Sequence, residues 1–142
     1  MIIDTTYLLP LARISVETDI LRAIADGRAK LSFDELKVSL ISLFELQAKA
    51  SKLDISPEYV FRAISVIFRS FYVVPFYELK VIRIAHELKD VLGDYIDRII
   101  VASAVALRED LLTEDRDIHD SKGFIEEKYG VKVYRYSDFA QT

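Results

Sequence analysis

The sequence has 142 residues, of which 51% are hydrophobic and 30% charged, and it contains no cysteine and no tryptophan. This composition excludes a disordered chain, a disulfide scaffold, a thiolate metal site and a cysteine nucleophile. Nineteen Lys and Arg against 23 Asp and Glu leave a net charge of −4. A nucleic-acid partner would therefore have to meet a local basic patch or bound cations.

No segment of the sequence predicts insertion into a membrane or export. The longest stretch without a charged residue is the nine residues from Ile99 to Leu107, whereas a membrane-spanning helix needs about 20. At the start of the chain, Asp4 interrupts the short apolar run that a signal peptide would extend. We therefore expect a soluble, cytoplasmic protein that forms one domain over residues 1–142.

Strand and helix patterns alternate along the chain. Strands are predicted over 1–3, 38–41, 71–76, 111–113 and 131–136. Helices are predicted over 20–26, 42–51, 56–70, 78–92, 94–108 and 124–129. Pro75 marks the third strand as an edge strand or a strand end. The alternation predicts an α/β fold with a central, mostly parallel sheet of four to five strands and helices on both faces.

Four acids lie at predicted strand ends or helix starts. Asp4 and Asp115 follow the first and fourth strands, and Glu45 and Asp97 lie near the starts of two helices. These positions share one rim of a parallel sheet, which is where open α/β proteins bind ligands. Carboxylates gathered there repel one another, and bound Mg²⁺ or Mn²⁺ relieves the repulsion because hard cations prefer oxygen ligands. The pattern therefore indicates an acidic metal site.

Each acid also has a purely structural interpretation. Ser42 to Glu45 matches a capping box, in which the glutamate holds the backbone N–H of the serine. Asp94 and Asp97 fit the N-cap and third positions of a helix, where negative charge is favoured. Asp115 lies in a polar run that is typical of a solvated turn. The metal-site hypothesis depends on the shared position of the acids and not on any one of them.

Four short segments of the chain stand in a characteristic order and spacing, namely Ile2–Thr6, Ser42–Glu45, Asp94–Ala104 and Leu111–Asp117. Together they resemble the PIN-domain nucleases, and among them the VapC-type toxin ribonucleases of toxin–antitoxin pairs. The resemblance covers essentially the whole chain. It implies a PIN-like domain over residues 1–142 and Mg²⁺- or Mn²⁺-dependent hydrolysis of RNA phosphodiester bonds. Many members have glycine or proline before the third acid, where this chain has Tyr95–Ile96.

The resemblance also implies a role for individual residues. The catalytic, metal-binding residues would be Asp4, Glu45, Asp97 and Asp115. Auxiliary residues would be Thr6, Asp94, Thr113 and Asp117. We assign the first metal to Asp4 and Asp97, while Glu45 and Asp115 bind through water or hold a second metal. The implied partners are an RNA substrate, a cognate antitoxin protein and a second copy of the chain in a homodimer.

Basic residues and one aromatic helix mark candidate contact surfaces. The RNA-contact candidates near the predicted site are Lys49, Arg98 and Arg116, and Arg98 has pairing with Asp94 as an alternative role. The helix predicted over 56–70 carries two apolar stripes, Phe61, Ile64, Phe68 and Phe71 on one side and Val60 and Ile67 on another. One stripe is expected to pack on the sheet, and the other is a candidate contact for a dimer or an antitoxin.

Other functions stay open on the sequence alone. A phosphoacceptor receiver needs adjacent acids after the first strand, and a haloacid-dehalogenase-type phosphatase needs an acid at the position of Thr6. A catalytically inactive PIN module that acts through protein contacts predicts that at least one of the four acids is missing, yet all four are present. A housekeeping RNA-processing nuclease would use the same acids as a toxin.

Overall fold

The computed structural model describes residues 1–141, and its strands form one five-stranded sheet in the order β3-β2-β1-β4-β5. Every pair of neighbouring strands in this sheet is parallel. The strands are short, with the bounds β1 (Ile2–Ile3), β2 (Lys37–Ser39), β3 (Tyr72–Val74), β4 (Leu111–Leu112) and β5 (Val133–Tyr134). The predicted α/β fold with a parallel sheet is confirmed, and β3 lies at the sheet edge as Pro75 indicated.

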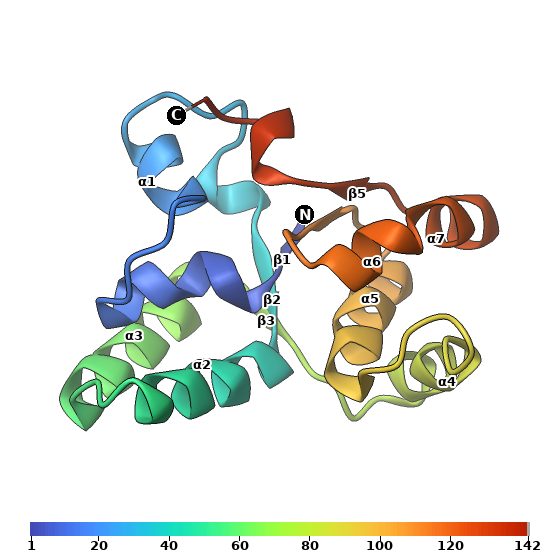
Figure 1. The fold of residues 1–142 in the computed structure, drawn as a ribbon, viewed down its shortest axis with the longest axis horizontal. Helices are drawn as coiled ribbons and strands as arrows, with labels where there is room; N and C mark the ends of the chain where they lie inside the picture. Colours follow the sequence, from blue (N-terminus) through green and yellow to red (C-terminus); the bar gives the residue numbers. More distant parts are fainter. Residues whose placement is uncertain (142) are drawn as a thin grey trace.

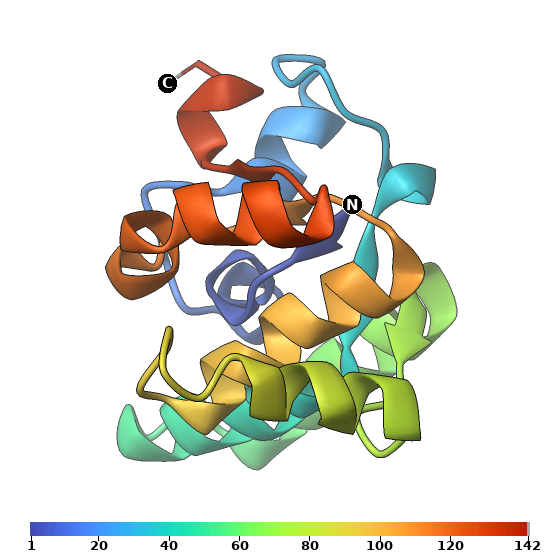
Figure 2. The ribbon, with the colours of Figure 1, turned by 90° about the vertical axis from the view of Figure 1, so that its right-hand side faces the viewer.

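Helices fill the connections between the strands. With η for a 3₁₀ helix, their bounds are η1 (Thr5–Ala12), α1 (Ile20–Ala25), η2 (Phe33–Glu35), α2 (Leu40–Lys52), α3 (Pro57–Ser70), α4 (Leu79–Glu87), α5 (Tyr95–Leu107), α6 (Arg116–Asp120), α7 (Lys122–Tyr129) and η3 (Tyr136–Asp138). In Figure 1, η1 and α1 to α3 lie on one side of the sheet and α4 to α7 on the other. Figure 2 views the molecule from the side of α4 to α7. Within residues 1–141, no helix is long and apolar enough to cross a bilayer.

The central strands are buried on both faces because successive side chains of a strand point in opposite directions. In β1, Ile2 packs with residues of α4, α5 and α7, whereas Ile3 packs with residues of η1, α1, α2 and α3. Leu111 and Leu112 of β4 divide between the same two cores. All four side chains are fully buried. Helices therefore cover both faces of the sheet, as the sequence predicted.

The boundary between β2 and α2 differs from the prediction. The strand ends at Ser39, which is the N-cap of α2, so the helix begins at Leu40 and includes Ser42 in its first turn. An apolar run such as 38–41 does not distinguish a strand from a buried helix turn. In the structure Leu40 and Ile41 pack against the two cores as the first residues of α2. The capping-box interpretation of Glu45 is therefore wrong.

Several short elements were not predicted, and others are shorter than predicted. The 3₁₀ helix η1 and the five-residue helix α6 have no strong periodic pattern, and each begins at an aspartate that accepts a backbone hydrogen bond. The helix predicted over 78–92 ends at Glu87 and continues as turns. Aspartate capping makes such short helices possible because it satisfies N–H groups that have no partner within the helix.

The order of the strands defines where a ligand would bind. From β1 the chain continues to β2 and β3 on one side, whereas β4 and β5 extend the sheet on the other side of β1. The strand order therefore reverses between β1 and β4, and open α/β sheets bind ligands beyond the carboxyl ends of the strands at such a point. Asp4 follows β1 and Thr113 follows β4.

Candidate active site

Asp4 joins the ends of β1 and β4. Its backbone N–H donates to the carbonyl of Leu112 at 3.0 Å, and its side chain is only 8% exposed. Its Oδ1 accepts from the N–H of Thr5 at 2.7 Å, and its Oδ2 accepts from the hydroxyl of Thr113 at 2.6 Å. Burial raises the pKa of Asp4, and the two hydrogen bonds oppose that shift while the charge of Asp115 adds to it.

Glu45 reaches the same region from the second turn of α2. Its Oε1 lies 2.5 Å from the hydroxyl oxygen of Thr5, which is also 3.0 Å from the hydroxyl oxygen of Ser42. Burial raises the pKa of Glu45, the hydrogen bond from Thr5 lowers it, and the charges of Asp4 and Asp94 raise it further. Glu45 is therefore close enough to the other acids to be affected by their charge.

Asp97 lies in the first turn of α5. The N-cap of this helix is Asp94, whose Oδ1 accepts from the N–H groups of Ile96 at 2.8 Å and Asp97 at 3.3 Å. Burial, followed by the charges of the neighbouring carboxylates, raises the pKa of Asp97 to about 7; the carboxylates are Asp115, Asp94, Asp4 and Glu45. Among residues 1–141 no hydrogen bond or ion pair is formed by the Asp97 carboxylate, which distinguishes it from the other three acids.

Asp115 is the N-cap of α6 and is half-buried. Its Oδ1 accepts from the N–H of Ile118 at 2.9 Å, and its own N–H donates to the hydroxyl oxygen of Thr113 at 3.0 Å. Since the Thr113 hydroxyl also donates to Asp4, this one side chain connects the first and the last acid of the set. The Thr113 carbonyl in turn lies 2.7 Å from Nε2 of His119.

The four acids line one cavity with a volume of about 230 Å³. Its other lining residues are Thr5, Thr6, Leu9, Lys49 and Glu114. The structure therefore brings together the four predicted acids, the predicted auxiliary Thr6 and the RNA-contact candidate Lys49. Asp94 lies outside the lining but near enough to raise the pKa of two of the acids. The predicted auxiliary Thr113 acts through its hydrogen bond to Asp4.

Three further residues named by the sequence, besides Asp94 and Thr113, lie outside the lining of the cavity. Arg116 and Asp117 are exposed in the first turn of α6. The Arg98 guanidinium donates to the carbonyls of Leu92 at 2.6 Å and Gly93 at 3.2 Å, so it fastens the turn that precedes α5. Within the described chain it forms no ion pair with Asp94. The alternative role of Arg98, pairing with Asp94, is therefore wrong, and its contact with RNA stays a prediction.

Two polar residues of the cavity, Thr5 and Glu114, were not identified from the sequence, nor was the apolar Leu9. The hydroxyl of Thr5 donates to Glu45. Glu114 lies between Thr113 and Asp115 in the sequence and lines the cavity. Thr5 and Glu114 are both immediate neighbours of a predicted acid in the sequence, which is the signal that was available. Their partners are distant in sequence, so the contacts themselves could not be read from a local pattern.

The donor set of the cavity suits a hard divalent cation. All four acids offer carboxylate oxygens, which Mg²⁺ and Mn²⁺ prefer. None of the ion pairs among residues 1–141 neutralises any of the four. In the same residues, no three Asp, Glu or His side chains converge closely enough to hold one ion, and three of the four acids accept hydrogen bonds from the protein. The residues fit a metal ion that draws these carboxylates together.

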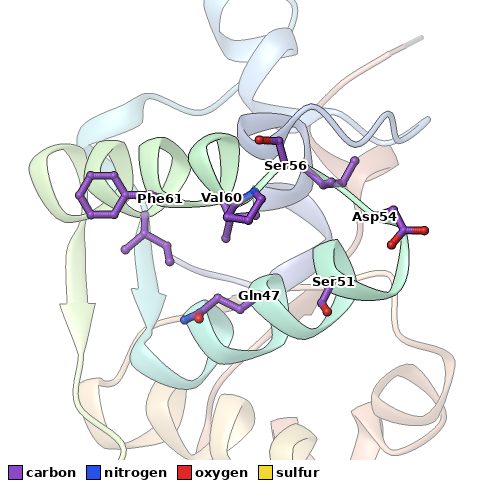
Figure 3. Close-up of a pocket in the computed structure, with 9 residues that line it drawn as sticks. Gln47, Ser51, Asp54, Ser56, Val60 and Phe61 are labelled. Carbon is purple, nitrogen blue, oxygen red and sulfur yellow. The ribbon is translucent and has the colours of Figure 1, made fainter.

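A larger groove lies between α2 and α3 and has a different character. Its volume is about 550 Å³, and in Figure 3 Val60 and Phe61 on α3 stand opposite Gln47 and Ser51 on α2. The only acid in its lining is Asp54. On α3, Ile67 is fully buried, but Val60 of the same predicted stripe lines the groove. The other predicted stripe is also divided: Ile64 and Phe71 pack against the core, whereas Phe61 is 71% exposed and Phe68 56%.

Comparison with known proteins agrees with this architecture. A family model described as the PIN domain matches residues 1–123. The chain therefore belongs to the PIN-domain family, whose members are typically metal-dependent nucleases. A search of curated proteins finds no match.

Several solved structures share the fold. FitAcB from Neisseria gonorrhoeae is 19% identical with a TM-score of 0.67, covering 96% of this chain and 97% of its own. VapBC-1 from nontypeable Haemophilus influenzae has the same identity and coverages with a TM-score of 0.63. A toxin–antitoxin complex from Klebsiella pneumoniae is 18% identical with a TM-score of 0.62, covering 82% of this chain and 88% of that one. At such identities the likeness establishes the fold alone.

Proposed function

We propose that the protein is a metal-dependent endoribonuclease that hydrolyses RNA phosphodiester bonds. The observation that supports this most is the cavity beyond β1 and β4, which carboxylates from four separate segments line, none of them in an ion pair among residues 1–141. The pKa values of Asp4, Glu45 and Asp97 are raised by burial first, and the charges of the neighbouring carboxylates add to the shift. A bound cation would offset the cost of keeping these charges together, and membership of the PIN-domain family, whose members are typically metal-dependent nucleases, supports a catalytic role for the cavity.

The residues of the cavity have distinct roles in this proposal. Asp97 and Asp4 hold the first Mg²⁺ or Mn²⁺, and Glu45 and Asp115 bind through water or hold a second ion. When bound, the ion supplies an activated water and stabilises the negative charge that develops on the phosphate. Lys49, which lines the same cavity, attracts the RNA backbone toward these acids.

The most specific form of the proposal is a toxin of a VapBC-type toxin–antitoxin pair. Its support is that similarly folded proteins were solved as VapBC or toxin–antitoxin complexes. The partners would be a cognate antitoxin and a second copy of the chain. The exposed stripe with Phe61 and Phe68 is our candidate for one of these contacts, since exposed aromatic side chains are typical of protein interfaces.

The test is cleavage of a mixed pool of RNAs of many sequences. We expect the wild-type protein to cut RNA with Mn²⁺ or Mg²⁺ and to stop when a chelator is added. Asp4→Asn should cut no faster than a blank without protein. Asp54→Asn makes the same chemical change in the α2–α3 groove and should cut like the wild type. Equal cleavage by wild type and Asp4→Asn, or cleavage that persists in chelator, would contradict the proposal.

A further inference from the structure

A buried tyrosine contacts the rim of the acidic cavity. The ring of Tyr7, on η1, is fully buried in the core on the side of α1 to α3. Its hydroxyl donates a short hydrogen bond to Oε2 of Glu114, a residue whose side chain lines the cavity. The backbone N–H of Tyr136 donates to the same oxygen at 2.7 Å. An acidic side chain exposed at the cavity is therefore held by two donors from the protein.

The place of Glu114 in the chain gives this contact its significance. It lies between Thr113, whose hydroxyl holds Asp4, and Asp115, one of the four acids. The bond from Tyr7 ties this loop to η1, which begins directly after Asp4, and the bond from Tyr136 ties it to the start of η3. One carboxylate oxygen thus joins three segments that are distant in the sequence.

Besides the bond from Thr113 to Asp4, two further contacts act on the ends of the loop. The His119 ring contacts the carbonyl of Thr113, and the Asp115 carboxylate caps the helix that it begins. Neither contact fixes the loop relative to η1. Hydrogen bonds to a charged carboxylate are about twice as strong as neutral ones, so two of them on one oxygen restrain a side chain effectively. The two hydrogen bonds from Tyr7 and Tyr136 therefore restrain the loop through the side chain of Glu114.

We propose that Glu114 is a positioning residue of the candidate active site, held by Tyr7 and Tyr136 so that the Thr113 hydroxyl stays on Asp4 and Asp115 stays in the lining of the cavity. Its consequence for metal binding rests on the proposed function, whereas its effect on the loop does not. Groups that orient metal ligands typically contribute about 10–100-fold to metal affinity. In this proposal the exposed carboxylate of Glu114 orients the metal ligands and is not itself a ligand.

The test compares four variants in amide hydrogen exchange without metal and in Mn²⁺ titration calorimetry. Tyr7→Phe removes only the hydroxyl, and Glu114→Ala removes the acceptor. Glu114→Gln keeps an oxygen that accepts both hydrogen bonds. Tyr129→Phe is the matched control, because the Tyr129 hydroxyl donates to Glu87 at 3.0 Å on another part of the surface.

We expect Tyr7→Phe and Glu114→Ala to speed exchange of the N–H groups of Asp115 and Ile118 at least about tenfold and to weaken Mn²⁺ binding about 10–100-fold. Exchange within α5 should stay as in the wild type, which shows that the variants are folded. Glu114→Gln should remain within about threefold of the wild type in both measurements, because rescue by the amide is expected of a positioning group. Tyr129→Phe should change neither measurement.

Two results would overturn the inference. The first is unchanged exchange of the loop in both Tyr7→Phe and Glu114→Ala. The second is a loss of Mn²⁺ binding in Glu114→Gln as large as in Glu114→Ala, which would make Glu114 a ligand. If the wild type binds no Mn²⁺, the proposed function fails, and the exchange measurement alone then decides whether Glu114 positions the loop.

Discussion

Two concave regions of this molecule share helix α2 and differ in almost everything else. Glu45 and Lys49 line the acidic cavity of about 230 Å³, and Gln47 and Ser51 line the apolar groove of about 550 Å³. The smaller region lies at the carboxyl ends of the central strands, where the strand order reverses. The larger one lies between two helices. The larger of the two regions is therefore the one with fewer ionisable side chains.

The difference between the two regions is electrostatic. Bringing carboxylates together away from water is costly unless a counter-charge is present, whereas an open apolar groove costs little. A raised pKa on Asp4, Glu45 and Asp97 shows that this cost is present in the acidic cavity. A cluster of charged side chains that lowers the stability of the folded protein is therefore a better guide to a functional site than the size of a surface cavity.

The largest expected effect is on metal binding by Asp97. We predict that Asp97→Asn weakens Mn²⁺ binding more than about 100-fold, beyond the range for groups that only orient a ligand. The reason is that its carboxylate has no protein partner among residues 1–141 and is the most available to a cation. Titration calorimetry measures the effect. The control is Asp54→Asn, in the groove, which should bind Mn²⁺ like the wild type, and equal loss in both variants would remove the distinction between the regions.

The second effect concerns the hydroxyl that connects two of the acids. Thr113→Val keeps the shape of the buried side chain but removes the donor to Asp4 and the acceptor for the N–H of Asp115. We predict a loss of about 10–100-fold in Mn²⁺ affinity, as for other groups that orient metal ligands. The same substitution at Thr18, outside both regions, serves as the control. An unchanged affinity in Thr113→Val would show that Asp4 needs no such support.

The third effect is a dependence of stability on pH. The pKa of Asp97 is about 7 in the folded protein against an ordinary value of 3.8, so between these values the folded state binds more protons than the unfolded state. The free energy of unfolding of the metal-free protein should therefore rise as the pH falls from about 8 to 5.5. Each pKa unit corresponds to about 1.4 kcal/mol, and after allowance for solvent screening at this half-buried group we expect a gain of about 1 kcal/mol.

Two further measurements separate Asp97 from other titrating groups. Asp97→Asn should remove most of the rise in denaturant unfolding experiments. In saturating Mn²⁺ the trend should reverse, because protons and the ion compete for the same carboxylates. A metal-free protein whose stability only decreases below pH 8 would contradict the clustering of the acids.

The smallest effect is expected in the groove. Phe61 is 71% exposed, so Phe61→Ser should change the free energy of unfolding by no more than about 0.5 kcal/mol. Its Mn²⁺ affinity should stay within about twofold of the wild type, since the side chain lies outside the acidic cavity. Thermal unfolding and calorimetry measure these quantities. A large loss of metal affinity in this variant would show that the two regions are coupled through α2.

The acidic cavity could be predicted from the sequence because its acids lie at strand ends and near helix starts, which the order of the elements brings to one edge of the sheet. Asp4 and Asp115 were placed by the strands before them, and Asp97 by the helix that it begins with Asp94. Glu45 was placed correctly despite a wrong helix start, since a shift of two residues in α2 leaves it on the same element. A position at a strand end can be predicted because the buried strands of a parallel sheet appear in the sequence as short hydrophobic runs, whose ends are easy to recognise.

The contacts around the acids could not be predicted in the same way. The bond between Tyr7 and Glu114 joins residues 107 positions apart, and nothing in either neighbourhood indicates the other. Arg98 had pairing with Asp94 as an alternative role, yet its guanidinium donates to backbone carbonyls of the preceding turn. Helix η1 has no periodic pattern and depends on Asp4 as its cap. Such details follow from packing between distant segments, which local patterns do not contain.

The most direct test of the central claim is to locate the metal ion itself. Small amounts of Mn²⁺ broaden the NMR signals of nearby backbone amides, and the effect decreases steeply with distance. We predict that the amides of Thr6, Asp97 and Glu114 lose intensity first, while those of Ser56 and Phe61 in the groove keep theirs. Broadening that begins in the groove, or that is absent throughout the protein, would contradict the assignment of a metal site to the four acids.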